Sequence, residues 1–207
     1  MSTPSRPYHH GDLRAALLRQ AEDVLARRGV DGLSLRELAR AAGVSHGAPR
    51  HHFRDRQALL DALALDGYAR LGARLDAALD GDGDGDGDGD GDGNVTERLT
   101  VFARAYVAFA LDHPALLGLM HRAKDESGDE RLTAANDAAF AAPVRLLAEA
   151  RERGAIDPDT SGRVDMSVLA VLQGLAVLAS TGTTGGRSVD ALVSDTVATL
   201  MRGLRPR

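Results

Sequence analysis

Hydroxyl, imidazole and guanidinium groups gather in one short stretch of this 207-residue chain. Ser45, His46, Arg50 and the pair His51–His52 all stand within eight consecutive positions. Side chains of these types donate hydrogen bonds to phosphate oxygens and to the edges of bases. The stretch therefore indicates contact with nucleic acid, provided that the surrounding elements present it to solvent.

Two other chemistries are compatible with parts of the same region. The run GVSHG around Ser45 matches the G-x-S-x-G nucleophile elbow of serine hydrolases, but that motif requires a strand leading into the serine turn. A helical pattern precedes Ser45 here. The pairs His9–His10 and His51–His52 lack the i, i+4 spacing of a helical zinc site. We therefore expect no catalytic serine, no metal site and no cofactor.

The element that would carry these groups is a helix-turn-helix over Ser34–Phe53. Ser34 and Glu37 have capping-box spacing, and Gly43 can end the first helix with a positive φ. The apolar positions of this helix recur at i, i+3, i+4 and i+7: Leu35, Leu38, Ala39 and Ala42. In such a motif the second helix lies in the major groove of DNA.

The second helix is expected to begin at Ser45 as its N-cap, with Pro49 in or just beyond the first turn, where a missing N–H costs least. Val44 and Phe53 are expected in the core. A preceding helix that ends at Gly29 would complete a three-helix head, with one apolar stripe: Leu13, Leu17, Ala21, Val24 and Leu25.

Charge is divided unevenly along the chain. The net charge is −5, yet residues 1–60 hold ten arginines against six acidic residues, and five of the seven histidines. Residues 61–207 carry a net charge of −9. Phosphate would attract the first part and repel the second, so the distribution predicts a protein that reads DNA at one end.

Composition also limits the classes of protein. The chain has no cysteine, so it has neither a disulfide framework nor a thiolate zinc site. Its start shows no apolar signal region, and residues 164–179 are too short and too polar in places to span a bilayer. We expect a cytoplasmic protein with no membrane partner. A transport or scaffold protein with a similar helical body is disfavoured, because only the head is basic.

The remaining chain predicts a helical body, residues 57–207, behind a DNA-binding domain, residues 1–56. A long helix over 57–79 would connect the two. Further helices are expected over 95–111, 115–123, 132–153 with a kink near Pro143, 164–181 and 189–204. The apolar content of 164–181 fits a helix buried within its own domain or one that also packs on a second copy. No strand pattern occurs.

Residues 80–94 consist almost entirely of Asp-Gly repeats, which cannot bury apolar surface, and are predicted to form a disordered loop. Asp86, Asp88, Asp90, Gly91 and Glu97 match the pattern of a calcium-binding loop. Any Asp-Gly repeat satisfies most of that pattern, so only Glu97 is independent information. We therefore prefer the disordered loop to the calcium site.

The stretch from Tyr8 to about Leu63 resembles the DNA-binding head of the TetR (tetracycline-repressor-like) regulators. The resemblance lies in the run ARRGVDGLSLRELARAAGVSHGAPRHHF followed by RDRQALLDAL. In the body, DHPALLGLMH and VLQGLAVLA are similar to the family's His-Pro segment and dimer-forming helix. The resemblance implies an all-α repressor, a homodimer through its last two helices, which binds a palindromic operator and releases it when a small molecule occupies the body.

The resemblance also implies which residues contact the operator. Carried over by position, they are Ser34, Ser45, His46, Gly47, Arg50, His51, His52 and Arg56. Arg56 would clamp the DNA backbone. The chain departs from the family at Arg50, where a tyrosine is common; an arginine could contact phosphate or read guanine bidentately. The operator sequence therefore does not transfer.

The effector site is expected among apolar and aromatic side chains of the body. The candidates by position are Phe102, Tyr106, Phe109, Met120, His121, Phe140, Met166 and Gln173. For each of them, a packing role in the core is the preferred alternative. Their apolar bias predicts a hydrophobic or aromatic effector.

Overall fold

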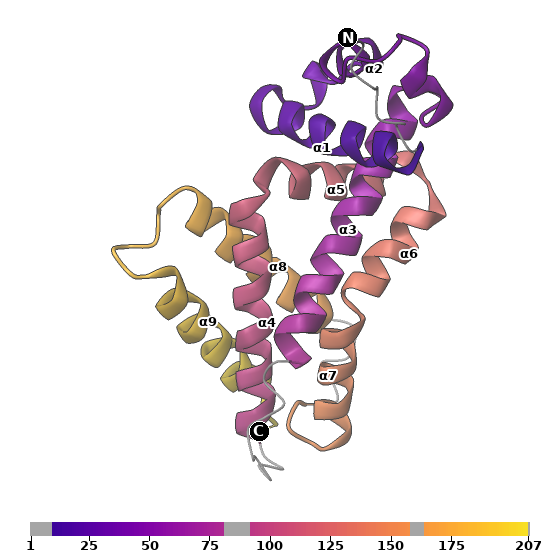
Figure 1. The fold of residues 1–207 in the computed structure, drawn as a ribbon. Coiled ribbons are helices and arrows are strands. Elements are labelled where there is room, and N and C mark those ends of the chain that lie inside the picture. Colours follow the sequence, from indigo (N-terminus) through magenta and orange to yellow (C-terminus); the bar gives the residue numbers. More distant parts are fainter. Residues whose placement is uncertain (1–9, 81–91, 158–163, 207) are drawn as a thin grey trace. The chain divides into compact units, whose positions relative to one another are not determined.

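The computed structural model describes residues 10–80, 92–157 and 164–206 (Figure 1). All regular structure within these ranges is helical, which confirms the all-α prediction. The elements are α1 (His10–Arg28), η1 (Val30–Gly32), α2 (Leu35–Ala41), η2 (Ala48–His51), α3 (Arg56–Asp80), α4 (Asp92–Asp112), α5 (Pro114–Ser127), α6 (Glu130–Ala139), α7 (Ala141–Glu152), α8 (Val164–Ser180) and α9 (Val189–Leu204).

The Asp-Gly repeat is flanked by helix on both sides. Asp80 is the last residue of α3, and Asp92 and Asn94 belong to the first turn of α4, so the prediction of a disordered loop is wrong at these ends. Residues 81–91, which include most of the calcium-loop pattern, lie outside the described residues.

The chain divides into two compact units, which we describe separately. Unit 1 comprises Met1–Gly67 and Ala115–Thr133, and unit 2 comprises Tyr68–Pro114 and Ala134–Arg207. Unit 1 thus combines the helix-turn-helix with most of α5. The boundary predicted at residue 56 divides the chain into two consecutive segments. The compact units are not consecutive segments, because α3 contributes residues to both and most of α5 belongs to unit 1.

Unit 1 has its core between α1, α2 and the first half of α3. Leu17, Ala21 and Leu59 are completely buried, and Phe53 is 2% exposed, as its predicted core position requires. Val44, also predicted in the core, is only half-buried. The first helix ends before Gly29, as predicted.

The turn after α2 forms as predicted, because glycine occupies the one position that needs it. Gly43 has φ of 67°. Its N–H donates to the carbonyl of Arg40 at 3.2 Å, and the N–H of Val44 donates to Ala39 at 3.0 Å. These two bonds make a Schellman motif, which satisfies carbonyls at the end of α2 and turns the chain toward the second element of the motif.

Two local predictions for the helix-turn-helix are wrong. Ser34 occupies the N-cap of α2 with extended backbone, but its side chain makes no capping hydrogen bond. The second element is not an α-helix beginning at Ser45 but the short 3₁₀ helix η2, whose N-cap is Gly47. Pro49 within η2 has no N–H to give to an i−4 carbonyl, and the N–H of His52 closes an i−3 turn onto Pro49 at 3.0 Å.

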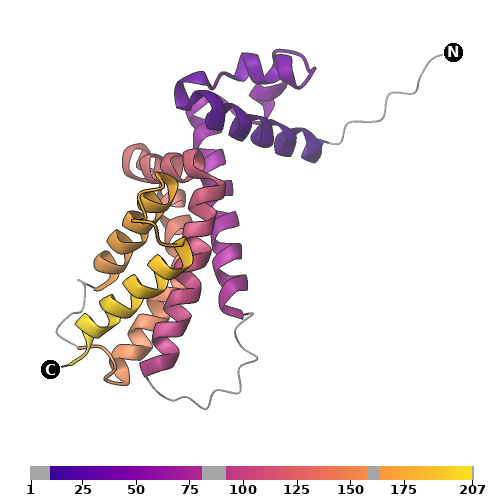
Figure 2. The same cartoon turned by 90° about the vertical axis from the view of Figure 1, so that its left-hand side faces the viewer.

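Unit 2 is built around α4, which packs against α7, α8 and α9 (Figure 2). The side chains of Phe102, Tyr106 and Phe109 on α4 are at most 2% exposed. Helix α9 begins and ends at the predicted residues, because Val193, Val197 and Met201 face this core at helical spacing. Among the described residues, no helix combines the length and apolarity that crossing a membrane requires.

The helix predicted over 132–153 is interrupted rather than kinked. Helix α6 ends at Ala139 and α7 begins at Ala141, with Phe140 between them at φ −104° and ψ 10°. Pro143 has no N–H to donate to the carbonyl of Ala139, four residues earlier, so the ladder of hydrogen bonds lacks a member at this point. The break brings the Phe140 ring to 6.2 Å from that of Phe102 and 6.0 Å from that of Tyr106.

Helices α3 and α5 approach closely in unit 1 at Gly67. A Cβ atom at this position would lie 2.7 Å from Sδ of Met120 and 3.2 Å from Cδ1 of Leu116. Met120 is completely buried, so it has no free space to move into. Glycine is therefore required for the observed packing of these two helices.

We predict that Gly67→Ala lowers the free energy of unfolding by about 1–2 kcal/mol, because overpacking outweighs the gain in helix propensity. Gly118→Ala is the matched control: it lies on α5, and nothing is within 4 Å of an added Cβ. The control should gain up to about 1 kcal/mol. Urea unfolding of both variants measures the difference, and equal stability would contradict the packing argument.

Candidate nucleic-acid interface

Six of the eight residues predicted to contact DNA lie on the turn after α2 and on η2 with its caps, whereas Ser34 begins α2 and Arg56 begins α3. Ser45, His46, Gly47, Arg50 and His51 are exposed. His52 is half-buried, with its ring 6.4 Å from that of Phe53. The Schellman turn and the 3₁₀ helix thus present a hydroxyl, imidazoles and a guanidinium on one continuous segment, a set of donors suited to phosphate and base edges.

Part of this set borders a hollow beside α2. Ser34 and His46 line a cavity of about 740 Å³ together with three arginines, Arg28, Arg36 and Arg40, and two acidic residues, Asp31 and Glu37. Arg36 and Arg40 are one helical turn apart on the exposed face of α2. Neither arginine was predicted to contact DNA, although the i, i+4 spacing of two cations on the polar face of the first helix is a signal that could have identified them.

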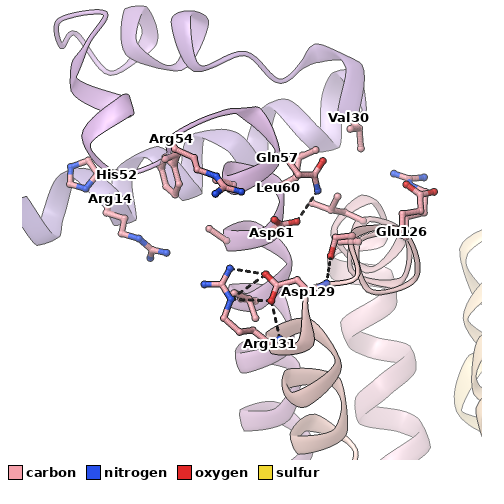
Figure 3. Close-up of a pocket in the computed structure, with 18 of the residues that line it drawn as sticks. Arg14, Val30, His52, Arg54, Gln57, Leu60, Asp61, Glu126, Asp129 and Arg131 are labelled. Carbon is pink, nitrogen blue, oxygen red and sulfur yellow. Dashed lines mark hydrogen bonds and ion pairs between the residues drawn. The ribbon is translucent and has the colours of Figure 1, made fainter.

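The other part borders a separate cleft of about 1050 Å³ in unit 1 (Figure 3). Arg50, His51 and His52 line it together with Arg14 and Arg54. The guanidinium carbon of Arg14 lies 5.6 Å from the centroid of the Phe53 ring, a cation–π contact that joins α1 to the end of the helix-turn-helix.

Acidic groups form the opposite wall of this cleft. Gln57 donates to Asp61 at 2.8 Å on α3 (Figure 3). Asp129 accepts three hydrogen bonds from the Arg131 guanidinium, at 2.7, 3.1 and 3.1 Å, and one from its backbone N–H at 2.9 Å. The hydrogen bonds from Arg131 hold the pKa of Asp129 below its usual value. Since both signs of charge line the cleft, we do not place phosphate contacts inside it.

Arg56 lies apart from the other predicted contacts. It is the first residue of α3, as expected, but its guanidinium is turned toward the protein. Nε donates to the carbonyl of Leu33 at 3.0 Å, and a terminal nitrogen donates to that of Val30 at 2.6 Å. The clamp on the DNA backbone stays a prediction that no contact in the structure tests.

The alternative chemistries find no support in the geometry. Ser45 follows helix α2 and the Gly43 turn, not the strand that a nucleophile elbow needs. Across the described ranges, no group of three or more histidine or acidic side chains is arranged to hold a metal ion.

Two family profiles match the chain. Residues 17–63 match "Bacterial regulatory proteins, tetR family", and residues 99–200 match "Tetracyclin repressor-like, C-terminal domain". The chain belongs to the TetR family. This confirms the resemblance drawn from the head and extends it through the body.

Individual relatives agree with this assignment. The class A tetracycline repressor of transposon 1721 from Escherichia coli is 52% identical over 48 residues, which are 23% of this chain and 22% of the repressor. An HTH-type transcriptional repressor of Mycobacterium tuberculosis is 40% identical over 65 residues, 31% of this chain and 35% of that protein. The matches thus span about a fifth to a third of these curated relatives.

A solved structure covers the whole molecule. A protein of unknown function from Rhodococcus sp. RHA1 is 43% identical, with a TM-score of 0.84 over 98% of this chain and 100% of its own. This TetR-family chain therefore shares its fold with that protein over 98% of its own length.

The body of this TetR-family chain contains an apolar cavity of about 590 Å³ within unit 2. Three of the predicted effector residues line it, Phe102, Phe140 and Met166. The other apolar residues of its lining were not predicted to contact an effector: Ala141, Pro143, Val144, Leu147, Val168, Leu169 and Leu172. They belong to α7 and α8, in which so many positions are apolar that the sequence does not distinguish cavity residues from packing residues.

The remaining five candidates lie elsewhere. Met120 and His121 are on α5 in unit 1, where burial lowers the pKa of His121. The Phe109 ring packs 5.0 Å from that of His113 at the end of α4. Gln173 lies on α8, and its side chain interacts with the Tyr106 hydroxyl. The Tyr106 ring lies 6.0 Å from that of Phe140, which lines the cavity.

Tyr106 is completely buried, and its hydroxyl makes no hydrogen bond of good geometry with the described part of the chain. Burial, and then the neighbouring Tyr68, raise its pKa above the ordinary value of 10.0, while the Gln173 side chain acts in the opposite direction. The hydroxyl therefore stays neutral in the folded protein at pH values where an unfolded tyrosine ionises.

We predict that Tyr106→Phe leaves stability at pH 7 within about 1 kcal/mol of the native chain, because the hydroxyl interacts with the Gln173 side chain but makes no hydrogen bond of good geometry there. Above pH 10 only the unfolded Tyr106 releases its proton, so this residue should lower native stability by about 1.4 kcal/mol per pH unit. Denaturant unfolding from pH 7 to 11 should show a smaller alkaline loss in the variant. Parallel curves would contradict the raised pKa.

Proposed function

We propose that the chain is a ligand-responsive transcriptional repressor, which binds a palindromic operator as a homodimer and releases it when a small molecule occupies unit 2. The observation that carries the proposal is the exposed row of donors from Ser45 to His51 on the helix-turn-helix of a TetR-family chain. The net positive charge of residues 1–60, against the acidic remainder, supports an orientation with the head toward DNA.

The primary test is binding of the purified chain to the DNA that flanks its own gene, measured across a salt series. A protected palindrome with a steep salt dependence is the expected result, because each phosphate contact releases a counterion. Weak binding that is indifferent to sequence would refute the operator proposal.

Gly47 supplies a chain-specific argument for close approach to DNA. It lies at the start of η2 with φ −82° and ψ −23°, a conformation that any residue adopts. Nothing in the chain lies within 4 Å of an added Cβ. Neither backbone geometry nor packing within the chain therefore requires glycine at this exposed position, and the missing side chain leaves room for close approach of a bound partner.

We predict that Gly47→Ala folds with native stability, or slightly higher, but binds the operator at least about tenfold more weakly, because the methyl group holds the turn away from base edges. Fluorescence anisotropy with labelled operator measures the loss, and thermal unfolding measures stability. Gly118→Ala, in the same unit, serves as the control and should keep native affinity. Native affinity of Gly47→Ala would remove this argument.

The face of α8 that its own unit leaves uncovered supports the homodimer. Met166 and Val177 are 66% and 58% exposed, and Ala170 and Gly174 between them continue the same stripe at i+4 and i+8. Nothing lies within 4 Å of a Cβ at Gly174, so a facing helix could approach closely there. We propose that a second copy of the chain covers this stripe, together with the exposed side of α9.

We predict that Val177→Glu converts the dimer to a monomer, because it places a charge within the face that the second copy is proposed to bury. Leu111→Glu is the control, since Leu111 is also an exposed apolar residue of unit 2, at 39%, but lies on α4. It should remain dimeric. Light scattering coupled to size-exclusion chromatography gives both masses; a monomeric native chain would refute the proposal.

The cavity of unit 2 supports an apolar effector. Its lining is almost entirely aromatic and aliphatic, with Asn136, Asp137 and Arg145 as the polar residues. An effector releases the operator only if it binds the conformation that does not fit DNA more tightly. Because α3 is one continuous helix from Arg56 to Asp80, we propose that it carries the change to the heads, which must match grooves about 34–36 Å apart.

A further inference from the structure

The side chain of Arg56 joins two distant parts of the head. Its two hydrogen bonds reach Leu33 and Val30, which precede Arg56 by 23 and 26 residues. Both acceptors belong to the turn between α1 and α2. The whole helix-turn-helix, α2 and η2 with the turn between them, therefore lies within a loop that one side chain closes.

The acceptors are well placed to fix α2. Leu33 is 2% exposed and directly precedes Ser34, the N-cap of the helix. The carbonyl of Val30 also accepts the N–H of Leu33 at 3.0 Å, so the guanidinium binds a turn that is already ordered. The side chain of Ser34 makes no capping bond, which leaves the start of α2 dependent on this turn.

The geometry needs an arginine. Nε–H and one terminal N–H point along the same edge of a planar guanidinium, so they reach two carbonyls at once. The carboxylate of Asp31 lies 3.9 Å from the same terminal nitrogen and offsets part of its charge. A lysine at this position has one flexible ammonium group and cannot reproduce the pair of bonds.

We infer that Arg56 is a positioning residue: it closes the helix-turn-helix onto the α1–α2 turn and thereby orients η2 for the operator, rather than serving as a clamp on phosphate. The inference rests on the proposed operator binding. Arg56 then contributes to sequence-specific binding, and not to the electrostatic attraction between basic side chains and the phosphates of any DNA.

The test compares Arg56→Lys and Arg56→Ala with the native chain on operator and on unrelated DNA, each over a salt series. A positioning role predicts that both variants lose at least about tenfold in operator affinity, because both lose the paired bonds. Binding to unrelated DNA should fall less than about threefold, and the salt dependence of Arg56→Lys should stay native. A general loss of folded protein would lower both affinities equally.

A phosphate clamp predicts the opposite pattern. Arg56→Lys would then keep most of the affinity and specificity, since its ammonium still meets phosphate. Arg56→Ala would weaken operator and unrelated DNA together, and the slope of log K against log salt would fall by about two for the dimer. Either result would overturn the inference.

Hydrogen exchange separates this inference from the proposed function. In Arg56→Lys, the amides between Leu33 and Phe53 should exchange faster than in the native chain, while those of α4 and α9 keep native rates. If the native chain binds no operator, the proposed function fails, and native exchange rates in this segment would independently show that Arg56 does not close the helix-turn-helix.

Discussion

One helix is shared by both cores of this molecule, and the rest of the structure depends on it. Leu59 and Leu63 of α3 are completely buried in unit 1, and Leu71 and Leu75 are completely buried in unit 2. The twenty-five residues of α3 carry no proline, so an unbroken ladder of backbone hydrogen bonds connects the two sets. Neither core can be repacked at α3 without displacing a helix that the other core also uses.

The arginines of unit 1 fall into two groups. Arg56 and Arg131 form hydrogen bonds within the protein, to backbone carbonyls in one case and to the Asp129 carboxylate in the other. Arg50 and Arg36 are exposed and form no ion pair within the described ranges. Net charge alone cannot distinguish these groups, because the same guanidinium can hold a turn or meet a phosphate.

Helices and their ends followed from local patterns. Periodic apolar residues predicted α1, α3 and α9, and Gly29 and Gly43, both with positive φ, follow helix ends where the sequence predicted them. The break at Phe140 and the 3₁₀ form of η2 were not predicted, because a single proline permits a kink, a break or a shorter helix, and packing decides among them.

The candidate sites were less predictable than the helices. The identity of the donors near Ser45 follows from the sequence, but the partners of Arg56 are more than twenty residues away and no periodicity connects them. The same holds for the cavity of unit 2, where Phe102 and Phe140 meet only through the fold. Tyr106 and Met166 both stand in predicted helices and were both predicted to contact the effector, yet Tyr106 is buried and Met166 is 66% exposed.

The interruption between α6 and α7 has a consequence for the energetics of the cavity. Phe140, Pro143 and Val144 form one of its walls, and this wall contains the backbone position where a helical hydrogen bond is already missing. Separating two short helices at such a joint breaks fewer bonds than opening a continuous helix. In the wall of the cavity, the backbone at Pro143 therefore opens with one helical hydrogen bond already absent, and any movement there also changes the contacts of Phe140 with Phe102 and Tyr106 on α4.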